Sequence, residues 1–198
     1  MQTRTSTYTV AWTEPGVVTE RIAILGGTFT PVHNGHRALL HTAFQTASHD
    51  GTGEGHVIVG LTDTDLATRT RDDPDNPEYL GPFEKRRRDL DNELSRLGAA
   101  YSASFEIIRL SDTQGPAATR EDVDALIVSP EAKAQRRANE INRRRSRDGL
   151  RRLEIHTAPF VVAEDGTRIS STRIRSGEID AHGRILDDGG EGDQHTQR

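Results

Sequence analysis

Short runs of apolar residues recur along the chain, and segments with helical spacing fill most of the intervals between them. The apolar runs have the length of strands and lie at residues 21–25, 56–61, 104–110, 125–129 and 153–157. Helical patterns cover about residues 33–48, 82–97, 130–148 and 171–176. Strands that alternate with helices in this way are typical of a parallel sheet with helices packed against it.

We therefore expect an α/β protein with a Rossmann-like, doubly wound, parallel five-stranded sheet in a single domain. The chain has 198 residues with no internal repeat and no long linker, which is enough for one core. Residues 21–183 would form this domain, residues 1–20 an N-terminal extension for which the sequence favours disorder, and residues 184–198 a disordered tail. Residues 50–55 and 72–77 are rich in Gly, Pro or Asp and are expected to be surface loops. In such folds ligands bind beyond the carboxyl ends of the strands.

The composition removes several classes of function. The chain has no cysteine, which excludes a disulfide framework, a Cys-ligated zinc and a thiol nucleophile, and fits a cytoplasmic protein. No apolar stretch has the length of a membrane span, and the N-terminus lacks a secretory signal pattern, so we expect no membrane partner. The formal net charge of −5 argues against a general nucleic-acid binder.

The residues after the first apolar run predict a phosphate site. Residues 26–36 read Gly-Gly-Thr-Phe-Thr-Pro-Val-His-Asn-Gly-His and lead into a helical pattern. A strand, paired glycines and a helix start aim backbone N–H groups at an anion. His33 and His36 would share one face of the first helical turn and could donate hydrogen bonds to phosphate oxygens during group transfer. A zinc site would need a third ligand, which the neighbouring sequence does not supply.

This stretch resembles the signature of the nucleotidyltransferase superfamily of adenylyl- and cytidylyltransferases. The resemblance implies a second motif near the C-terminus, and residues 169–175, Ile-Ser-Ser-Thr-Arg-Ile-Arg, match it. Ser170 or Ser171 is a candidate N-cap of a short helix that would hold the β- and γ-phosphates of a nucleotide. Arg173 or Arg175 would add positive charge there.

Three further segments are similar to archaeal phosphopantetheine adenylyltransferase. They are Val-Ser-Pro-Glu at 128–131, Glu-Ile-Asn at 140–142 and Ala-Glu-Asp-Gly at 163–166, and the resemblance runs from about residue 21 to 183. It implies transfer of the adenylyl group of ATP to 4′-phosphopantetheine, giving dephospho-coenzyme A and pyrophosphate. ATP and 4′-phosphopantetheine would be the ligands, and Mg²⁺ would accompany ATP.

The resemblance also implies residue roles. His36 would stabilise the pentacoordinate α-phosphate, His33 would contact phosphate oxygens of ATP, and Thr28 would hold the attacking phosphate in line. The implied nucleotide-binding residues are Gly26, Gly27, Phe29, His33, Gly35, Ser129, Ser170, Ser171, Thr172, Arg173 and Arg175.

The acceptor would be bound by Thr28, Arg69, Arg71 and Asn142. Arg69 stands where relatives often carry a lysine that contacts the acceptor phosphate, and Arg71 is the competing anchor. Asn142 resembles an asparagine along the pantetheine arm, although a purely structural role is equally open. The basic run at residues 85–88 is expected to be a solvated helix face.

Two other functions stay open at this point. One is another adenylyl- or cytidylyltransferase of the same superfamily, such as nicotinamide mononucleotide adenylyltransferase, because the phosphate motifs are common to all of them. The other is a non-catalytic nucleotide sensor, which would be expected to have lost His36 or Thr28, and both are present. The sequence leaves monomer and homo-oligomer equally open.

Overall fold

The computed structural model describes residues 20–48, 55–70 and 80–186 of the chain. Its elements follow in the order β1 (Arg21–Gly27), α1 (Asn34–Ala47), β2 (Gly55–Thr62), α2 (Thr64–Thr70), α3 (Phe83–Tyr101), β3 (Ser104–Leu110), the 3₁₀ helix η2 (Gly115–Ala118), β4 (Ala125–Val128), α4 (Ala132–Arg147), β5 (Glu154–Thr157) and α5 (Ser171–Arg175). Within these described residues, no helix is long and apolar enough to span a membrane.

The strands form one five-stranded sheet in the order β3-β2-β1-β4-β5, and all pairs are parallel. The central strand, β1, pairs with β2 from Arg21 opposite Gly55 to Gly27 opposite Leu61. On its other side Ala23 lies opposite Ala125 of β4. The chain winds outwards from β1 through β2 to β3 and then returns to β4, so the strand order reverses between β1 and β4. Such a reversal leaves a crevice at the carboxyl ends of these two strands, which is where ligands bind in open α/β sheets.

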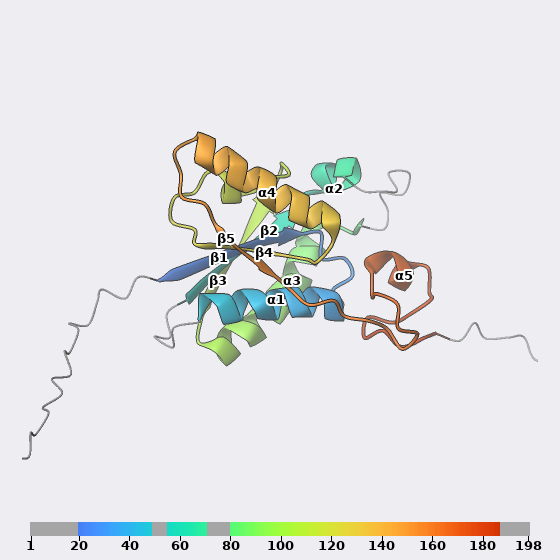
Figure 1. The fold of residues 1–198 in the computed structure, drawn as a ribbon. Coiled ribbons are helices and arrows are strands. Elements are labelled where there is room, and N and C mark those ends of the chain that lie inside the picture. The colour runs from blue at the N-terminus through green and yellow to red at the C-terminus, as the bar shows by residue number, and fades with distance from the viewer. Residues whose placement is uncertain (1–19, 49–54, 71–79, 187–198) are drawn as a thin grey trace, which may run out of the picture.

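Helices cover both faces of the sheet (Figure 1). α1 and α3 pack on one face, where Leu40, Phe44, Leu90 and Leu94 are fully buried. α4 packs on the other face and buries Ile141 there. Because the central strands are covered on both sides, they read as nearly continuous apolar runs, not as alternating patterns.

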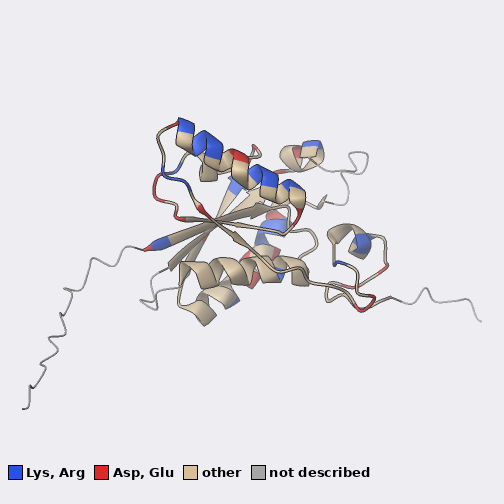
Figure 2. Ribbon diagram, viewed as in Figure 1, with Lys and Arg blue, Asp and Glu red and all other residues tan. Residues whose placement is uncertain are grey.

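α4 has two contrasting sides. Its buried side includes Ala138 and Ile141, whereas Lys and Arg occupy much of the rest of the helix (Figure 2). The buried Arg145 is an exception, and it donates hydrogen bonds to the backbone carbonyls of Ala117, Arg120 and Arg151. These bonds fix the C-terminal end of α4 against the loops before β4 and β5.

The predicted fold class is confirmed, and every predicted strand is present with its ends no more than two residues from the predicted positions. The sequence patterns missed α2, because this short helix buries only Leu66 and Ala67 and therefore shows little helical periodicity. Its start is marked by Asp63, whose Oδ1 accepts the Leu66 N–H at 2.7 Å. Residues 1–19, the predicted loop at 72–77 and almost all of the predicted loop at 50–55 lie outside the described residues.

The segment after β5 folds back against the start of α1. Val162 forms a backbone bridge with Arg168, and Ile179 forms one with Ile185. Asn34 at the start of α1 donates its backbone N–H to the Ala181 carbonyl at 3.0 Å, so α5 is tied to the carboxyl end of the sheet. The predicted start of the disordered tail at residue 184 therefore lies too early in the sequence, because Ile185 is part of this ordered segment. Residues 187–198 lie outside the described part of the chain.

Candidate active site

The loop between β1 and α1 brings three aromatic rings together. Phe29 is buried and adopts a left-handed backbone conformation with φ of 48°. Its ring lies 5.1 Å from that of His36. A side chain at Gly35 would place its Cβ 3.0 Å from Cε1 of His33. Glycine at position 35 therefore leaves room for the His33 ring, which explains why the motif has this residue between its two histidines.

His33 and His36 form one unit at the N-terminus of α1. His33 is the N-cap, and its Nδ1 accepts the backbone N–H of His36 at 3.3 Å. The two rings stack with centroids 3.8 Å apart and planes inclined by 25°. Because Nδ1 of His33 accepts a hydrogen bond, its proton resides on Nε2, which can donate to a ligand.

Both histidines are neutral at physiological pH. Burial, together with the positive charges of Arg168 and Arg37, lowers the pKa of His33 from 6.5 to about 4. Burial, followed by the neighbouring His33, lowers the pKa of His36 to about 3, although the Pro31 carbonyl acts in the opposite direction. Neutral imidazoles can still donate N–H groups to phosphate oxygens, and binding of an anion would raise both pKa values.

Two cavities meet at the carboxyl end of β1. The first, here called the histidine cavity, has a volume of about 200 Å³. It is lined by His33 and His36 at the start of α1 and by Phe160 and Arg168 from the segment after β5. The second, here called the threonine cavity, has a volume of about 320 Å³ and is lined by Thr28, Thr62 and Thr70 together with apolar residues of β4 and α4. Gly26 and Gly27 lie in the walls of both, so two ligands could meet across this turn.

Most of the predicted motif residues line one or both cavities. The residues placed there are Gly26, Gly27, Thr28, Phe29, His33, Gly35, His36 and Ser129. They come from the ends of β1 and β4 and from the start of α1, so the switch point of the sheet brings them together.

The second motif lies next to the histidine cavity, with Arg168 and Ile169 in the cavity wall. Ser170 is the N-cap of α5, as predicted, and its Oγ accepts the Arg173 N–H at 3.3 Å. The Arg173 guanidinium forms ion pairs with Asp165 and Glu178, so it braces its own segment. Arg175 donates to the Thr30 carbonyl at 3.3 Å and thereby joins the two motifs. The phosphate-binding roles of Ser170, Ser171, Thr172, Arg173 and Arg175 remain predictions.

Of the acceptor residues predicted from the sequence, Thr28 lines the threonine cavity, and the acceptor roles of the others stay predictions. Arg69 lies on α2 with its side chain exposed; it donates to the Ser111 carbonyl at 3.3 Å and does not line either cavity. Arg71 lies outside the described residues.

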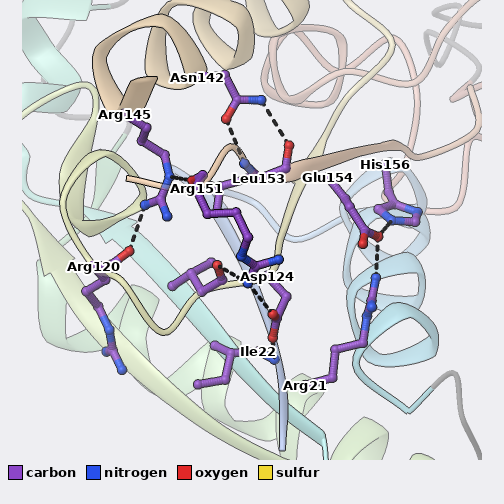
Figure 3. A network of polar contacts seen from close by, with 11 residues as sticks. Arg21, Ile22, Arg120, Asp124, Asn142, Arg145, Arg151, Leu153, Glu154 and His156 are labelled. Atoms are coloured by element: carbon purple, nitrogen blue, oxygen red, sulfur yellow. Dashed lines mark hydrogen bonds and ion pairs between the residues drawn. The ribbon is translucent and has the colours of Figure 1, made fainter. Parts of the chain in front are cut away.

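Asn142 is a buried structural residue (Figure 3). Its amide donates to the Leu153 carbonyl at 2.9 Å, and its Oδ1 accepts the Leu153 N–H at 2.8 Å. Both ends of the side chain are thus used to hold the start of β5 against α4. Asn142 lines neither cavity, and its assignment to the pantetheine arm stays a prediction.

Arg86 is buried, although it belongs to the basic run that the sequence predicts to be a solvated helix face. Its neighbours Lys85, Arg87 and Arg88 are exposed as expected, but Arg86 is only 1% exposed. Its Nη1 donates to the carbonyls of Thr28 at 3.2 Å and of Thr62 at 2.9 Å. Nε and Nη2 have no hydrogen-bond partner among the described residues. Burial lowers the pKa of this guanidinium, so an anion placed beside Thr28 would compensate a charge that is poorly solvated.

Arg86 could have been found from helical spacing. The apolar positions Leu90, Leu94 and Leu97 define the buried side of α3, and position 86 lies one turn before Leu90 on that same side. An arginine in a buried stripe is unusual and merits a functional hypothesis.

Comparisons with known proteins support one family. The cytidylyltransferase-like family model matches residues 24–177. A phosphopantetheine adenylyltransferase of Methanosarcina barkeri is 40% identical over 161 residues, covering 81% of this chain and 90% of the relative. The enzyme of that name from Methanothermobacter thermautotrophicus is 38% identical, covering 83% of this chain and 89% of the relative.

A solved structure from Archaeoglobus fulgidus, described as a protein of unknown function, is 25% identical with a TM-score of 0.54. The similarity covers 70% of this chain and 89% of that one. The chain therefore belongs to the cytidylyltransferase-like family and, within it, to the phosphopantetheine adenylyltransferases of archaea.

Proposed function

We propose that this protein transfers the adenylyl group of ATP to 4′-phosphopantetheine, with release of dephospho-coenzyme A and pyrophosphate. The observation that carries the proposal is the meeting of two cavities at Gly26 and Gly27, with the paired histidines on one side and Thr28 on the other. The archaeal relatives match most of the length of this chain, and their names supply the identity of the acceptor.

ATP would occupy the histidine cavity. There the Nε2–H of His33 and the His36 ring can donate to phosphate oxygens near the α1 N-terminus, where the helix dipole favours an anion. Both rings are neutral at physiological pH, so each carries one N–H group that can donate to a phosphate oxygen. His36 would bond more strongly to the pentacoordinate α-phosphate than to the ground state, which is how a fixed donor accelerates transfer.

The acceptor would occupy the threonine cavity. Its walls combine apolar residues such as Leu126 and Ile141, which suit a long flexible arm, with Thr28 near the reacting end. Arg86 does not line the cavity, but it bonds the Thr28 carbonyl, and its Nε and Nη2 have no hydrogen-bond partner among the described residues, so we propose that it stabilises the acceptor phosphate beside Thr28. Arg69 also lines neither cavity and stays a competing candidate for this role.

The chemical step follows from this placement. An oxygen of the acceptor phosphate attacks the α-phosphorus of ATP, a new P–O bond forms, and the bond to the β-phosphate breaks with departure of pyrophosphate. A general base is unnecessary, because the second pKa of a phosphate monoester is about 6 and the attacking oxygen is already ionised. Catalysis then consists of alignment and charge stabilisation.

Magnesium would enter with ATP. The described residues contain no group of three or more His, Cys, Asp or Glu side chains arranged to hold a metal ion. Mg²⁺ prefers oxygen ligands and keeps several waters, so the ATP phosphates themselves fit as its principal ligands. When bound, it would neutralise charge on the departing pyrophosphate. The cytoplasmic location and the Mg²⁺ requirement remain predictions.

The test is pyrophosphate release from ATP and Mg²⁺ with a panel of acceptors. The panel contains 4′-phosphopantetheine, pantetheine, nicotinamide mononucleotide, FMN and glycerol phosphate, and pantetheine is the matched control that lacks only the phosphate. Pyrophosphate release with 4′-phosphopantetheine, and with no other acceptor of the panel, supports the proposal. Release with another acceptor would overturn the acceptor but keep the phosphate chemistry. No release with any acceptor, despite binding of ATP, would favour a nucleotide sensor.

A further inference from the structure

Glu131 lies at the boundary between the two cavities. It is separated from the end of β4 by Ser129 and Pro130 and occupies the N-cap position of α4. Its backbone is extended, with φ −66° and ψ 137°. A carboxylate at this position commonly accepts N–H groups of the first helical turn. The Glu131 side chain makes no such capping bond. Its carboxylate is therefore available to another partner, and it lines both cavities.

The partner of Glu131 is Arg168. These side chains form an ion pair, and both are somewhat under half exposed, at 45% and 44%. The backbone of Arg168 is firmly held, because it forms a bridge with Val162 and its carbonyl accepts a hydrogen bond from Arg173. Arg168 is thus fixed beside the second motif, while its link to Glu131 is accessible to water. An ion pair of this kind is weak and can exchange its anion.

The composition of the wall makes this pair unusual. Among the described residues that line the histidine cavity, Arg168 is the only Arg or Lys and Glu131 is the only Asp or Glu. Both histidines in the wall are neutral at physiological pH. The one full positive charge in the wall is therefore tied to the one negative charge. A triphosphate entering this cavity meets a guanidinium already occupied by a carboxylate.

Arg168 is also close enough to His33 to lower the pKa of that ring. Its positive charge is the second cause, after burial, of the lowered pKa of His33. A guanidinium in this place can bind phosphate oxygens bidentately, which an ammonium cannot do.

We propose that Arg168 is a phosphate-binding residue for ATP and that Glu131 holds it until the nucleotide displaces the carboxylate. Glu131 is then an internal competitor that weakens ATP binding through Arg168. The inference rests on the proposed function only in taking ATP as the nucleotide.

The experiment is isothermal titration of the full chain with ATP, in EDTA and again with Mg²⁺, without any acceptor. Glu131→Gln removes the competing charge and should lower the Kd for ATP by about two- to fivefold. Arg168→Ala should raise the Kd by about tenfold, and Arg168→Lys should restore only part of the loss. In the double variant, Glu131→Gln should no longer tighten binding, because there is no guanidinium left to release.

Glu140→Gln is the matched control, since Glu140 is an exposed carboxylate on the same helix that lines neither cavity. It should leave the Kd unchanged. An unchanged or higher Kd for Glu131→Gln would overturn the proposal, and a rise confined to Mg²⁺ would instead identify Glu131 as a metal ligand. A tightening that persists in the double variant would also overturn it. These results are independent of whether any acceptor reacts, so they separate this inference from the proposed reaction.

Discussion

The imidazole of His33 stacks on that of His36 at 3.8 Å and accepts the His36 backbone N–H through Nδ1. This contact orients His33 by a bond within the helix terminus itself. It leaves the Nε2 proton of His33 directed away from the bond and keeps both rings in a buried environment where neutrality is favoured. The pair therefore suits hydrogen-bond donation to phosphate better than proton abstraction.

His36→Ala should reduce kcat strongly while leaving ATP binding nearly intact. Removal of one fixed donor to a developing negative charge typically costs about 10²- to 10³-fold in kcat. Steady-state kinetics gives kcat, and titration of ATP gives the Kd. A parallel loss of ATP affinity would show that His36 contributes to ground-state binding and not selectively to the transition state.

The two lowered histidine pKa values predict a loss of stability in acid. The folded pKa values of about 4 and about 3 lie below the ordinary value of 6.5, so the unfolded chain binds more protons between these limits. Stability is then lost as pH falls below 6.5 and the loss is complete near pH 3. At pH 5 each histidine should lower the free energy of unfolding by about 2 kcal/mol relative to pH 8.

Urea unfolding of the wild type and of His36→Asn at pH 8 and pH 5 measures this effect. The wild type should lose more stability than the variant on acidification. Equal losses would mean that the His36 environment does not penalise its protonated form.

Arg86→Lys should raise the KM for the acceptor far more than the KM for ATP. Lysine keeps a positive charge but lacks the planar group that contacts the Thr28 and Thr62 carbonyls and leaves two nitrogens for a phosphate. We expect a rise of about tenfold or more. Arg87→Lys, at an exposed neighbour on the same helix, is the matched control and should have no effect.

Arg69→Ala provides the decisive comparison, because it tests the acceptor anchor that the sequence predicts. A selective rise in acceptor KM for Arg69→Ala, with none for Arg86→Lys, would return the role to Arg69. Folding of each variant can be checked by its thermal midpoint, since Arg86 is buried.

Asn142→Ala should destabilise the protein without a selective effect on either substrate. The substitution leaves the Leu153 N–H and carbonyl without partners in a buried position, which should cost about 1–3 kcal/mol per group in the free energy of unfolding. Urea unfolding measures the stability, and kinetics on the folded fraction measures each KM. A selective rise in acceptor KM with normal stability would restore Asn142 to the acceptor site.

The sheet and the first motif could be predicted because their signals are local. β1 ends at Gly27 and β4 ends at Val128, just before Ser129, and parallel strands bring such ends to one edge. The spacing of His33 and His36 is likewise a property of one helical turn.

The acceptor side could not be predicted in the same way, because it depends on which side of a helix faces the core. Arg69 and Arg86 both occur in polar stretches, and only the packing of α2 and α3 exposes one and buries the other. An asparagine side chain can bond either a ligand or backbone groups. At Asn142 it bonds the backbone, because Leu153 lies beside it in the fold. The link between Glu131 and Arg168 joins segments distant in sequence and shows no local pattern.

The most direct test of the central claim is mass-spectrometric identification of the product formed from ATP, Mg²⁺ and 4′-phosphopantetheine, in parallel with nicotinamide mononucleotide. We expect dephospho-coenzyme A and pyrophosphate in equal amounts, no adenylylated nicotinamide product, and little of either product with His36→Ala. Adenylylation of nicotinamide mononucleotide in preference to phosphopantetheine would contradict it, because the threonine cavity would then hold a different acceptor.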